Sequence, residues 1–314
     1  MNHFPTKILL ATDASEDSVL AAQVAAELSS KTDSELHVVH VRSTLGQVPG
    51  YYLGPYVEEA DLQRLDAEAQ RLLNAQVEQI EAAGDLVTQA HLKIGRPDAE
   101  IVILAQELGA DLLVVGSRGR GGIRRALMGS VSDSVVRHAH CPVLVVRREE
   151  KNEGAAGFFP TKLVVATDGS EEATLAADVV ADIAAKTGSE LHIILVGLPA
   201  DYPGGTSEPL VTDIFTLSEE ELNEINDEFQ RQLDAQIEQI KAVKGIVAQA
   251  HLEIGKADEE IISLAEEIGA GLIALGSRGA GGLERALMGS VSDLVVRHAH
   301  CPVLVVRREQ QQAR

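Results

Sequence analysis

Short runs of apolar residues alternate along the chain with longer stretches in which apolar positions recur every three or four residues. The short runs predict β-strands and the longer stretches predict amphipathic α-helices. In the first half of the chain the predicted strands span residues 7–12, 35–41, 86–94, 112–115 and 142–146. The predicted helices span about 16–30, 57–82, 98–108 and 131–140. This alternation indicates an α/β domain with helices packed on a mostly parallel, five-stranded sheet.

The whole pattern occurs twice. The tetrapeptide Phe-Pro-Thr-Lys that begins at Phe4 returns at Phe159, and the tripeptide Ala-Thr-Asp that begins at Ala11 returns at Ala166. A repeat this long indicates duplicated domains rather than a solenoid. We therefore predict one domain at residues 1–148 and a second at 158–308, joined by a Gly- and Ala-rich linker at 149–157 and followed by a polar tail at 309–314.

Composition narrows the class of protein. The 314 residues are 45% apolar and carry a formal net charge of −21, which argues against nucleic-acid or anionic-membrane partners because both require a broad basic face. No apolar run approaches the roughly 18 residues that span a bilayer, and the N-terminus lacks the features of a secretory signal. Cys141 and Cys301 each precede a Pro and an apolar strand, so we expect buried thiols, no disulfide framework and a cytoplasmic location.

A glycine-rich stretch lies between the fourth predicted strand and the fourth predicted helix. Gly116 and Gly119 follow the strand directly, and Gly129 and Ser130 begin the helix. Glycines there permit a tight turn and a close approach of ligand to backbone, while the unpaired N–H groups and the dipole of the helix N-terminus favour a phosphate. The stretch contains neither a P-loop nor a complete dinucleotide fingerprint. A purely structural strand-to-helix turn is the alternative interpretation.

With its spacing Gly-x2-Gly-x9-Gly-Ser in both halves, and an Asp at the end of each first strand, the chain resembles the universal stress protein family in its tandem, ATP-binding form. The resemblance implies doubly wound domains with sheet order 3-2-1-4-5, in which the Asp helps to fix a nucleoside and the glycine pattern holds ribose and phosphates. The candidate ligand-binding residues of the first copy are Ala11, Thr12, Asp13, Val41, Gly116, Arg118, Gly119, Gly129, Ser130, Val131 and Ser132. Those of the second are Ala166, Thr167, Asp168, Val196, Gly276, Arg278, Gly279, Gly289, Ser290, Val291 and Ser292.

The two predicted sites differ in charge. Arginines occupy positions 118, 120, 124 and 125 of the first loop, whereas the second loop keeps only Arg278 and Arg285 and has Ala280 and Glu284 in the other two places. We expect weaker triphosphate binding at the second site because its loop carries fewer positive charges. The difference should be only ~1 kcal/mol, because exposed charges are well screened. The alternative is that these arginines do not bind the triphosphate but point to solvent or pair with acidic neighbours. The turn after the first strand also differs, with Ala14 in one copy and Gly169 in the other; a required positive φ would strain Ala14.

Three further features have simpler interpretations. His138, His140 and Cys141, repeated at 298, 300 and 301, are interpreted as a helix C-terminus rather than a metal site, because His is favourable there and no second group of ligands is evident. Tyr51, Tyr52 and Tyr56 fit loop packing better than a lid over a base. The apolar fifth strands at 143–146 and 303–306 invite edge pairing; the resemblance implies docking of the two domains through them about a pseudo-twofold axis, and whole chains can then associate as a homodimer.

The sequence therefore predicts a protein that binds ATP, with Mg²⁺ on the phosphates, and acts as a sensor or regulatory module with a protein partner that remains to be identified. A slow ATPase or autophosphorylating enzyme is one alternative, and a nucleotide-free scaffold is the other. Hydrolysis requires a residue that positions water, and no base is identifiable apart from Asp13 and Asp168. We assign no catalytic residue.

Overall fold

The structure is a computed structural model that describes residues 4–44, 59–119, 128–147, 159–197, 227, 230–231, 233–238, 248–279 and 288–307. Contacts divide the chain into two compact units, with the change between Phe159 and Pro160. The predicted linker and tail, the tyrosine-containing loop and most of the two arginine-containing loops lie outside the described residues. No helix among the described residues is long and apolar enough to cross a bilayer.

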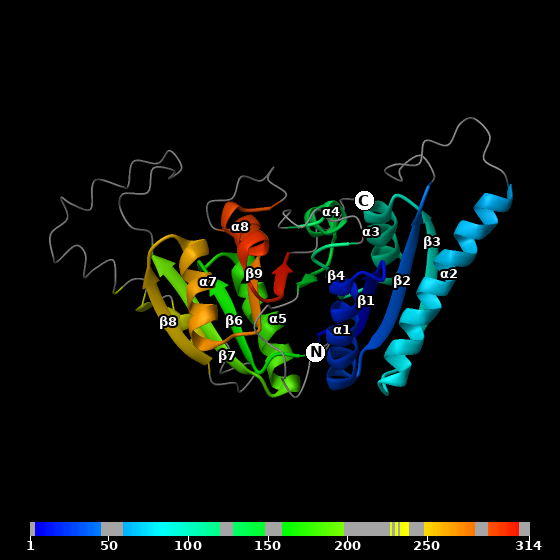
Figure 1. The fold of residues 1–314 in the computed structure, drawn as a ribbon. Helices are drawn as coiled ribbons and strands as arrows, with labels where there is room; N and C mark the ends of the chain where they lie inside the picture. The colour runs from blue at the N-terminus through cyan, green and yellow to red at the C-terminus, as the bar shows by residue number, and fades with distance from the viewer. Residues whose placement is uncertain are drawn as a thin grey trace, which may run out of the picture. The chain divides into compact units, whose positions relative to one another are not determined.

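The first unit is an α/β domain. Its elements are β1 (Lys7–Thr12), α1 (Glu16–Thr32), β2 (Glu35–Ser43), α2 (Glu59–Ala82), β3 (Gln89–Gly95), α3 (Pro97–Leu108), β4 (Leu112–Gly116), α4 (Ser130–His138) and β5 (Val143–Val146). The five strands are all parallel in the order β3-β2-β1-β4-β5, which confirms the predicted topology. Helices α1 and α2 pack together, as do α3 and α4 (Figure 1).

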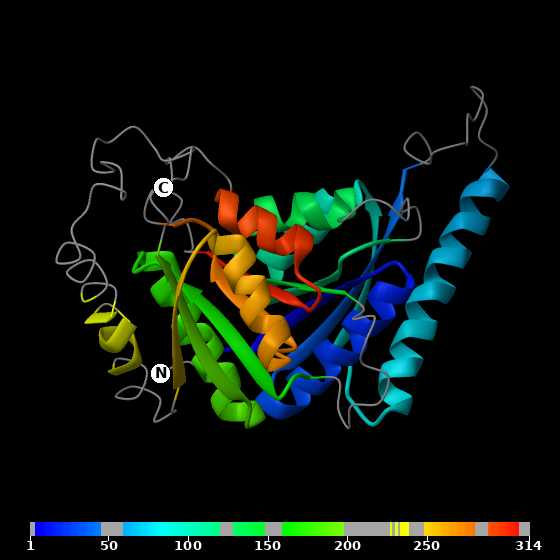
Figure 2. The same ribbon diagram turned by 60° about the vertical axis from the view of Figure 1, so that its left-hand side comes forward.

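The second unit repeats this arrangement. Its elements are β6 (Lys162–Thr167), α5 (Glu171–Thr187), β7 (Glu190–Gly197), β8 (Ala248–Ile254), α7 (Ala257–Ile268), β9 (Leu272–Gly276), α8 (Ser290–His298) and β10 (Val303–Val306). The strands are parallel in the order β8-β7-β6-β9-β10. Helices α7 and α8 lie side by side (Figure 2), and the described residues between 227 and 238 are helical. The docking of the domains through their fifth strands stays a prediction.

Burial explains why the strand prediction succeeds. Ile8, Leu9 and Leu10 of β1 are fully buried, as expected for a central parallel strand that is covered on both faces and therefore apolar at every position. The edge strand β3 has mostly exposed or half-buried residues, which matches its alternating sequence. It begins at Gln89, opposite His37, three residues later than predicted. By this register Leu86 lies opposite position 34, just before β2 starts at Glu35, and it is 83% exposed.

The structure shows a side-chain cap on α1 and confirms the buried thiols that the sequence predicts. Ser15 caps α1, because its side chain accepts a hydrogen bond from Ser18 N. Cys141 and Cys301 are buried free thiols. Helix α4 ends at His138, two residues before the predicted end, because Ala139 is already extended with φ −62° and ψ 144°.

Candidate functional site

The sheet order places the ends of β1 and β4 beside each other. Ala11 of β1 is paired with Val115 of β4, so Thr12 lies next to Gly116 at the carboxyl edge of the sheet. In the second domain β6 and β9 pair in the same way, from Leu163 opposite Leu272 onward. The strand order reverses here, from β1 to β2 on one side and from β4 to β5 on the other. Open α/β sheets bind their ligands at such a switch point. Two segments separated by about a hundred residues thus meet at one edge.

Asp13 and Gly119 lie close together at this edge of the sheet. A Cβ atom on Gly119 would overlap Asp13 Oδ2, and a Cβ on Gly279 would overlap Asp168 Oδ2. The other carboxylate oxygen accepts a hydrogen bond from a backbone N–H, 3.0 Å from Ser15 N in the first domain and 3.0 Å from Ser170 N in the second. The carboxylate is therefore oriented by the turn after the first strand, and a larger residue opposite it would have to displace it.

Among the described residues, no side chain caps the N-terminus of α4. Its N-cap is Gly129, with φ −76° and ψ 154°, and a glycine has no side chain to accept from the first turn. The first helical hydrogen bond runs from Asp133 N to Gly129 O at 2.9 Å. Ser130 and Val131 are exposed in that first turn. Gly289 caps α8 in the same conformation. A helix N-terminus whose N-cap residue has no side chain to accept its N–H groups, and which carries the positive end of the helix dipole, is suited to an anion.

The hydroxyl groups of Ser132 and Ser292 point into the protein. Ser132 Oγ donates to Ser117 O at 2.8 Å, and Ser292 Oγ donates to Gly276 O at 2.8 Å. Both residues are 4% exposed. These hydroxyls tie the first turn of the helix to the end of the preceding strand, so the first turn offers a ligand its N–H groups rather than these two side chains.

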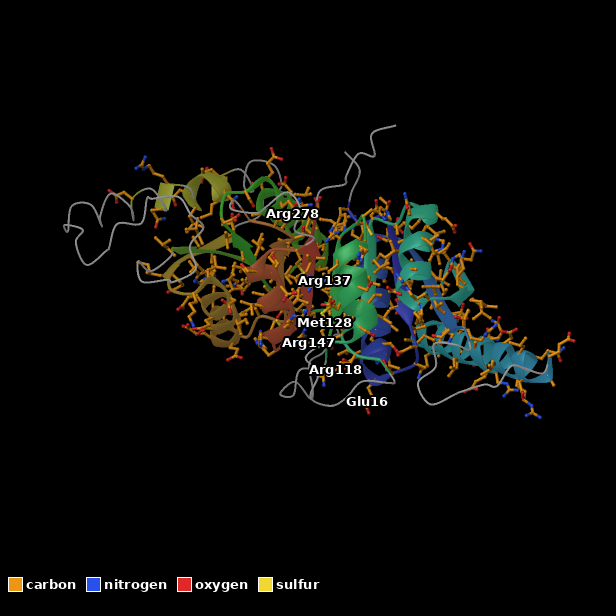
Figure 3. The ribbon with its side chains drawn as sticks, turned by 90° about the horizontal axis from the view of Figure 1, so that it is seen from above. Glu16, Arg118, Met128, Arg137, Arg147 and Arg278 are labelled. Carbon is orange, nitrogen blue, oxygen red and sulfur yellow. The ribbon has the colours of Figure 1, made fainter. Side chains whose placement is uncertain are left out.

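An acidic residue that the sequence analysis did not single out holds the start of the glycine-rich stretch. Asp17 Oδ2 accepts from Ser117 Oγ at 2.7 Å and from Arg118 N at 3.1 Å, and lies 3.8 Å from Arg118 Nε. In Figure 3, Arg118 lies beside Glu16, the neighbour of Asp17 in the first turn of α1. An acidic residue in the first turn of a helix is a visible sequence signal, but such residues are common there because the dipole favours them.

Glu172 takes the place of Asp17 in the second domain. Glu172 Oε2 accepts from Ser277 Oγ at 2.6 Å and from Arg278 N at 2.7 Å, while Oε1 lies 3.7 Å from Arg278 Nε. The arginine side chain is 27% exposed here, against 45% for Arg118. The second domain therefore keeps the contact with a longer side chain that uses both of its oxygens.

His40 is a second residue that the sequence analysis missed. This buried histidine lies in β2, and its Nδ1 is 2.8 Å from Thr12 O, a distance at which the ring N–H donates to the carbonyl. It thereby holds the residue that precedes Asp13. Leu195 occupies the corresponding position of the second domain, so that hydrogen bond is specific to the first. Val41 and Val196, the next residues along each second strand, are half-buried.

The structure shows that the turn after the first strand does require a positive φ at the position of Ala14. Ala14 has φ +58° and Gly169 has φ +75°, so both domains require the left-handed region at this position. In each case the N–H of this residue donates to the threonine hydroxyl two residues earlier, at 3.2 Å. The first domain therefore holds an alanine in a conformation that favours glycine.

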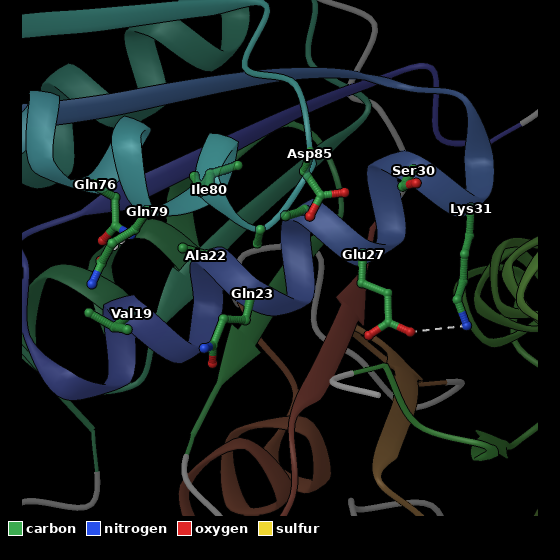
Figure 4. A pocket seen from close by; sticks show the side chains of 12 residues that line it. Val19, Ala22, Gln23, Glu27, Ser30, Lys31, Gln76, Gln79, Ile80 and Asp85 are labelled. Atoms are coloured by element: carbon green, nitrogen blue, oxygen red, sulfur yellow. Dashed lines mark hydrogen bonds and ion pairs between the residues drawn. The ribbon is translucent and has the colours of Figure 1, made fainter. Parts of the chain in front are cut away.

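The other candidates do not assemble into a second site. His138 Nδ1 lies 2.7 Å from Ser134 O and His298 Nδ1 lies 2.9 Å from Leu294 O, which supports their interpretation as helix C-terminal residues. In the part of the chain that the structure describes, no three His, Cys, Asp or Glu side chains are placed to share a metal ion. A hollow of about 470 Å³ lies between α1 and α2, where Glu27 and Lys31 form an ion pair (Figure 4); none of the candidate ligand-binding residues lines it.

Comparison with known proteins extends these observations. The sequence model of the universal stress protein family matches residues 5–147 and again 160–307. A universal stress protein of Mycobacterium tuberculosis is 28% identical over 320 residues, covering 98% of this chain and 96% of the relative. One from Methanocaldococcus jannaschii is 34% identical over 145 residues, covering 46% of this chain and 84% of the relative. The crystal structure of a universal stress protein from Archaeoglobus fulgidus matches with a TM-score of 0.68 and 25% identity, covering 98% of this chain and 97% of that one.

Proposed function

The chain belongs to the universal stress protein family, and on that premise we propose that each of its two domains binds ATP at the carboxyl edge of its sheet. In this proposal the aspartate after the first strand, Asp13 or Asp168, orients the nucleoside. The phosphates lie at the glycine-capped helix N-terminus, near Arg118 or Arg278, and carry Mg²⁺.

The contact between Asp13 and Gly119 is the observation that supports this proposal most. A carboxylate that is oriented by a backbone N–H lies against a glycine where an added Cβ would displace it, and the arrangement is the same for Asp168 and Gly279. Beside it lies a helix N-terminus with a glycine cap in both domains. If the glycine-rich stretch were only a structural strand-to-helix turn, it would need neither the oriented carboxylate nor the helix N-terminus without a capping side chain.

The regulatory part of the proposal follows from linkage. A ligand that binds one conformation more tightly than another shifts the population toward the first. The proposed site joins the ends of β1 and β4 to the start of α4, so a nucleotide bound there contacts three segments that are distant in sequence. We propose that ATP in this way sets the conformation, and through it the protein partner, of a stress-response module.

Mass spectrometry of the ligands released when the purified protein is denatured tests the proposal. Co-purified ATP supports it, whereas ADP alone favours the slow ATPase. The absence of nucleotide, together with no heat of binding when ATP and Mg²⁺ are added, would refute it in favour of a scaffold.

The double substitution Gly119→Val and Gly279→Val tests the location of the sites. Each valine places its side chain where the aspartate carboxylate now lies, so ATP binding should be lost while the circular dichroism spectrum is kept. Ala67→Val adds bulk at an exposed position of α2 and should leave binding intact. Persistent binding by a folded double variant would place the nucleotide elsewhere.

A further inference from the structure

Each domain contains a carboxylate beside the arginine that the proposed function places near the phosphates, Asp17 at Arg118 and Glu172 at Arg278. We infer that Asp17 and Glu172 are built-in competitors of the nucleotide phosphates, which lower the affinity of each site for charged ligands while holding its glycine-rich stretch in place. This inference rests on the proposed function and concerns the regulation of the same site.

The partners of Asp17 are donors of the kinds that bind phosphate oxygens, and among them the Arg118 side chain, 45% exposed, is the one open to solvent. Its Oδ2 accepts from a hydroxyl, Ser117 Oγ at 2.7 Å, and from a backbone N–H, Arg118 N at 3.1 Å, and faces a guanidinium at 3.8 Å. Hydroxyl, backbone N–H and guanidinium are the usual donors to protein-bound phosphate. The Asp17 side chain is only 13% exposed but that of Arg118 is 45% exposed, so water screens this pair in part.

The start of α1 holds Arg118 at several points. Besides the contacts of Asp17, Ser15 Oγ donates to Arg118 O at 3.1 Å. Asp17 itself lies in the first turn of a helix that Ser15 caps, where the dipole stabilises a negative charge. The carboxylate is therefore fixed in place, and a phosphate that binds Arg118 must share the guanidinium with it.

The second domain has the stronger competitor. Glu172 makes shorter hydrogen bonds, 2.6 Å and 2.7 Å, and faces Arg278 Nε at 3.7 Å with its other oxygen. Arg278 is also less exposed than Arg118. Glu172 should therefore withhold more of the positive charge of Arg278 from a ligand than Asp17 withholds from Arg118.

Replacing Asp17 or Glu172 by the corresponding amide removes the negative charge of the side chain but keeps its ability to accept hydrogen bonds. Asp17→Asn keeps an oxygen that accepts from Ser117 and Arg118 N, but it removes the negative charge. If Asp17 competes with phosphate, this variant should bind ATP about threefold more tightly, as expected for a partly exposed ion pair, and adenosine with unchanged affinity. Glu172→Gln should tighten ATP binding by about fivefold.

The experiment is calorimetric titration of the full chain with ATP and, separately, with adenosine. Site one is measured in the Gly279→Val background and site two in the Gly119→Val background, at low and at high NaCl concentration. Asp17→Asn should also make ATP binding more sensitive to salt, because it leaves one more uncompensated positive charge at the site. Asp33→Asn is the matched control, since it removes the same charge at the opposite end of α1, where Asp33 is an exposed C-cap.

The outcomes distinguish this inference from the proposed function. Tighter ATP binding with unchanged adenosine binding supports both. ATP binding that is equal or weaker in Asp17→Asn, in a protein whose wild type binds ATP, overturns the competitor and leaves the proposed function standing. Asp17→Ala separates a purely structural role, because it also removes the acceptor. If Asp17→Ala weakens ATP and adenosine binding equally while Asp17→Asn binds both like the wild type, the residue only holds the loop and the competitor is overturned. If neither the wild type nor any variant binds ATP, both ideas fail.

Discussion

The two domains form the same candidate site with different side chains around it. In the first, His40 holds the carbonyl of Thr12, Ala14 occupies a left-handed turn, and the carboxylate on Arg118 is that of an aspartate. In the second, leucine, glycine and glutamate take these places. The contact of the strand-one aspartate with a glycine and the glycine-capped helix are the same in both.

Comparing the two domains distinguishes the features that both sites share from the side chains around them that differ. The site exists because β1 and β4 are neighbours and because glycines let the chain pass close to the aspartate. Those features recur without change. The residues that tune charge and backbone strain around the site have changed, and so we expect two sites of unequal affinity rather than one active and one vestigial domain.

The largest expected effect comes from closing one site at a time. Gly119→Val should abolish ATP binding at the first site and leave the second, whereas Gly279→Val should do the reverse. The site that remains in Gly279→Val should bind about fivefold more tightly, equivalent to ~1 kcal/mol, because of the arginines of the first loop and the weaker competitor there. Calorimetric titration of the two single variants measures this ratio, and a tighter second site would reverse the comparison.

Acid should destabilise both domains. His37 Nδ1 lies 3.1 Å from His91 Nε2, and His192 Nδ1 lies 3.0 Å from His251 Nε2. Burial lowers the pKa of His91, and the neighbouring charges of His37 and Lys93 lower it further. Burial, followed by the charge of His251, lowers the pKa of His192 against the opposing effect of Glu190.

Because the folded-state pKa values lie below the unfolded value of 6.5, the unfolded chain binds these protons more readily, and the free energy of unfolding falls as the pH drops below that value. Hydrogen exchange of the strand peptides between pH 7 and pH 5 should show this loss of protection. His91→Gln should flatten the response of the first domain alone. An unchanged response in that variant would assign the acid sensitivity to other groups.

Exchanging the turn residues should move the stability of the two domains in opposite directions. Ala14→Gly relieves a positive φ and should stabilise the first domain by about 0.5–1 kcal/mol, after the entropic cost of glycine is deducted. Gly169→Ala should destabilise the second by about 1 kcal/mol. Thermal unfolding of each full-length variant gives the two shifts, which should differ in sign; shifts of the same sign would contradict the shared backbone conformation.

The smallest expected effect concerns an ion pair that only the first domain has. Lys93 Nζ lies 3.3 Å from Glu107 Oε2, whereas the corresponding positions of the second domain are Glu253 and Glu267. Glu253→Lys should therefore stabilise the second domain by about 0.5 kcal/mol, the usual worth of an exposed pair. Urea unfolding at low salt detects such a change, and 0.5 M NaCl should remove it.

Most of the fold follows from local pattern. Parallel strands covered on both faces must be apolar at every position, so runs such as Leu112–Gly116 are visible without a structure. The strand-to-helix glycines and the Ser15 cap are equally local. The start of β3 was predicted too early, because where a strand begins depends on where its partner β2 begins, and that partner lies about fifty residues away.

The sequence by itself thus determined the duplication, the α/β elements, and the pairing of an aspartate with a glycine pattern in each half, since all of these depend on residue type and spacing. Tertiary structure decided that Asp17 reaches Ser117, that His40 holds Thr12, that the Ser132 hydroxyl points inward, and that Ala14 has a positive φ. These contacts join segments brought together by the crossovers of the sheet, or depend on a single backbone angle. A pattern of apolar and polar positions carries no information on which oxygen meets which N–H group across such a distance.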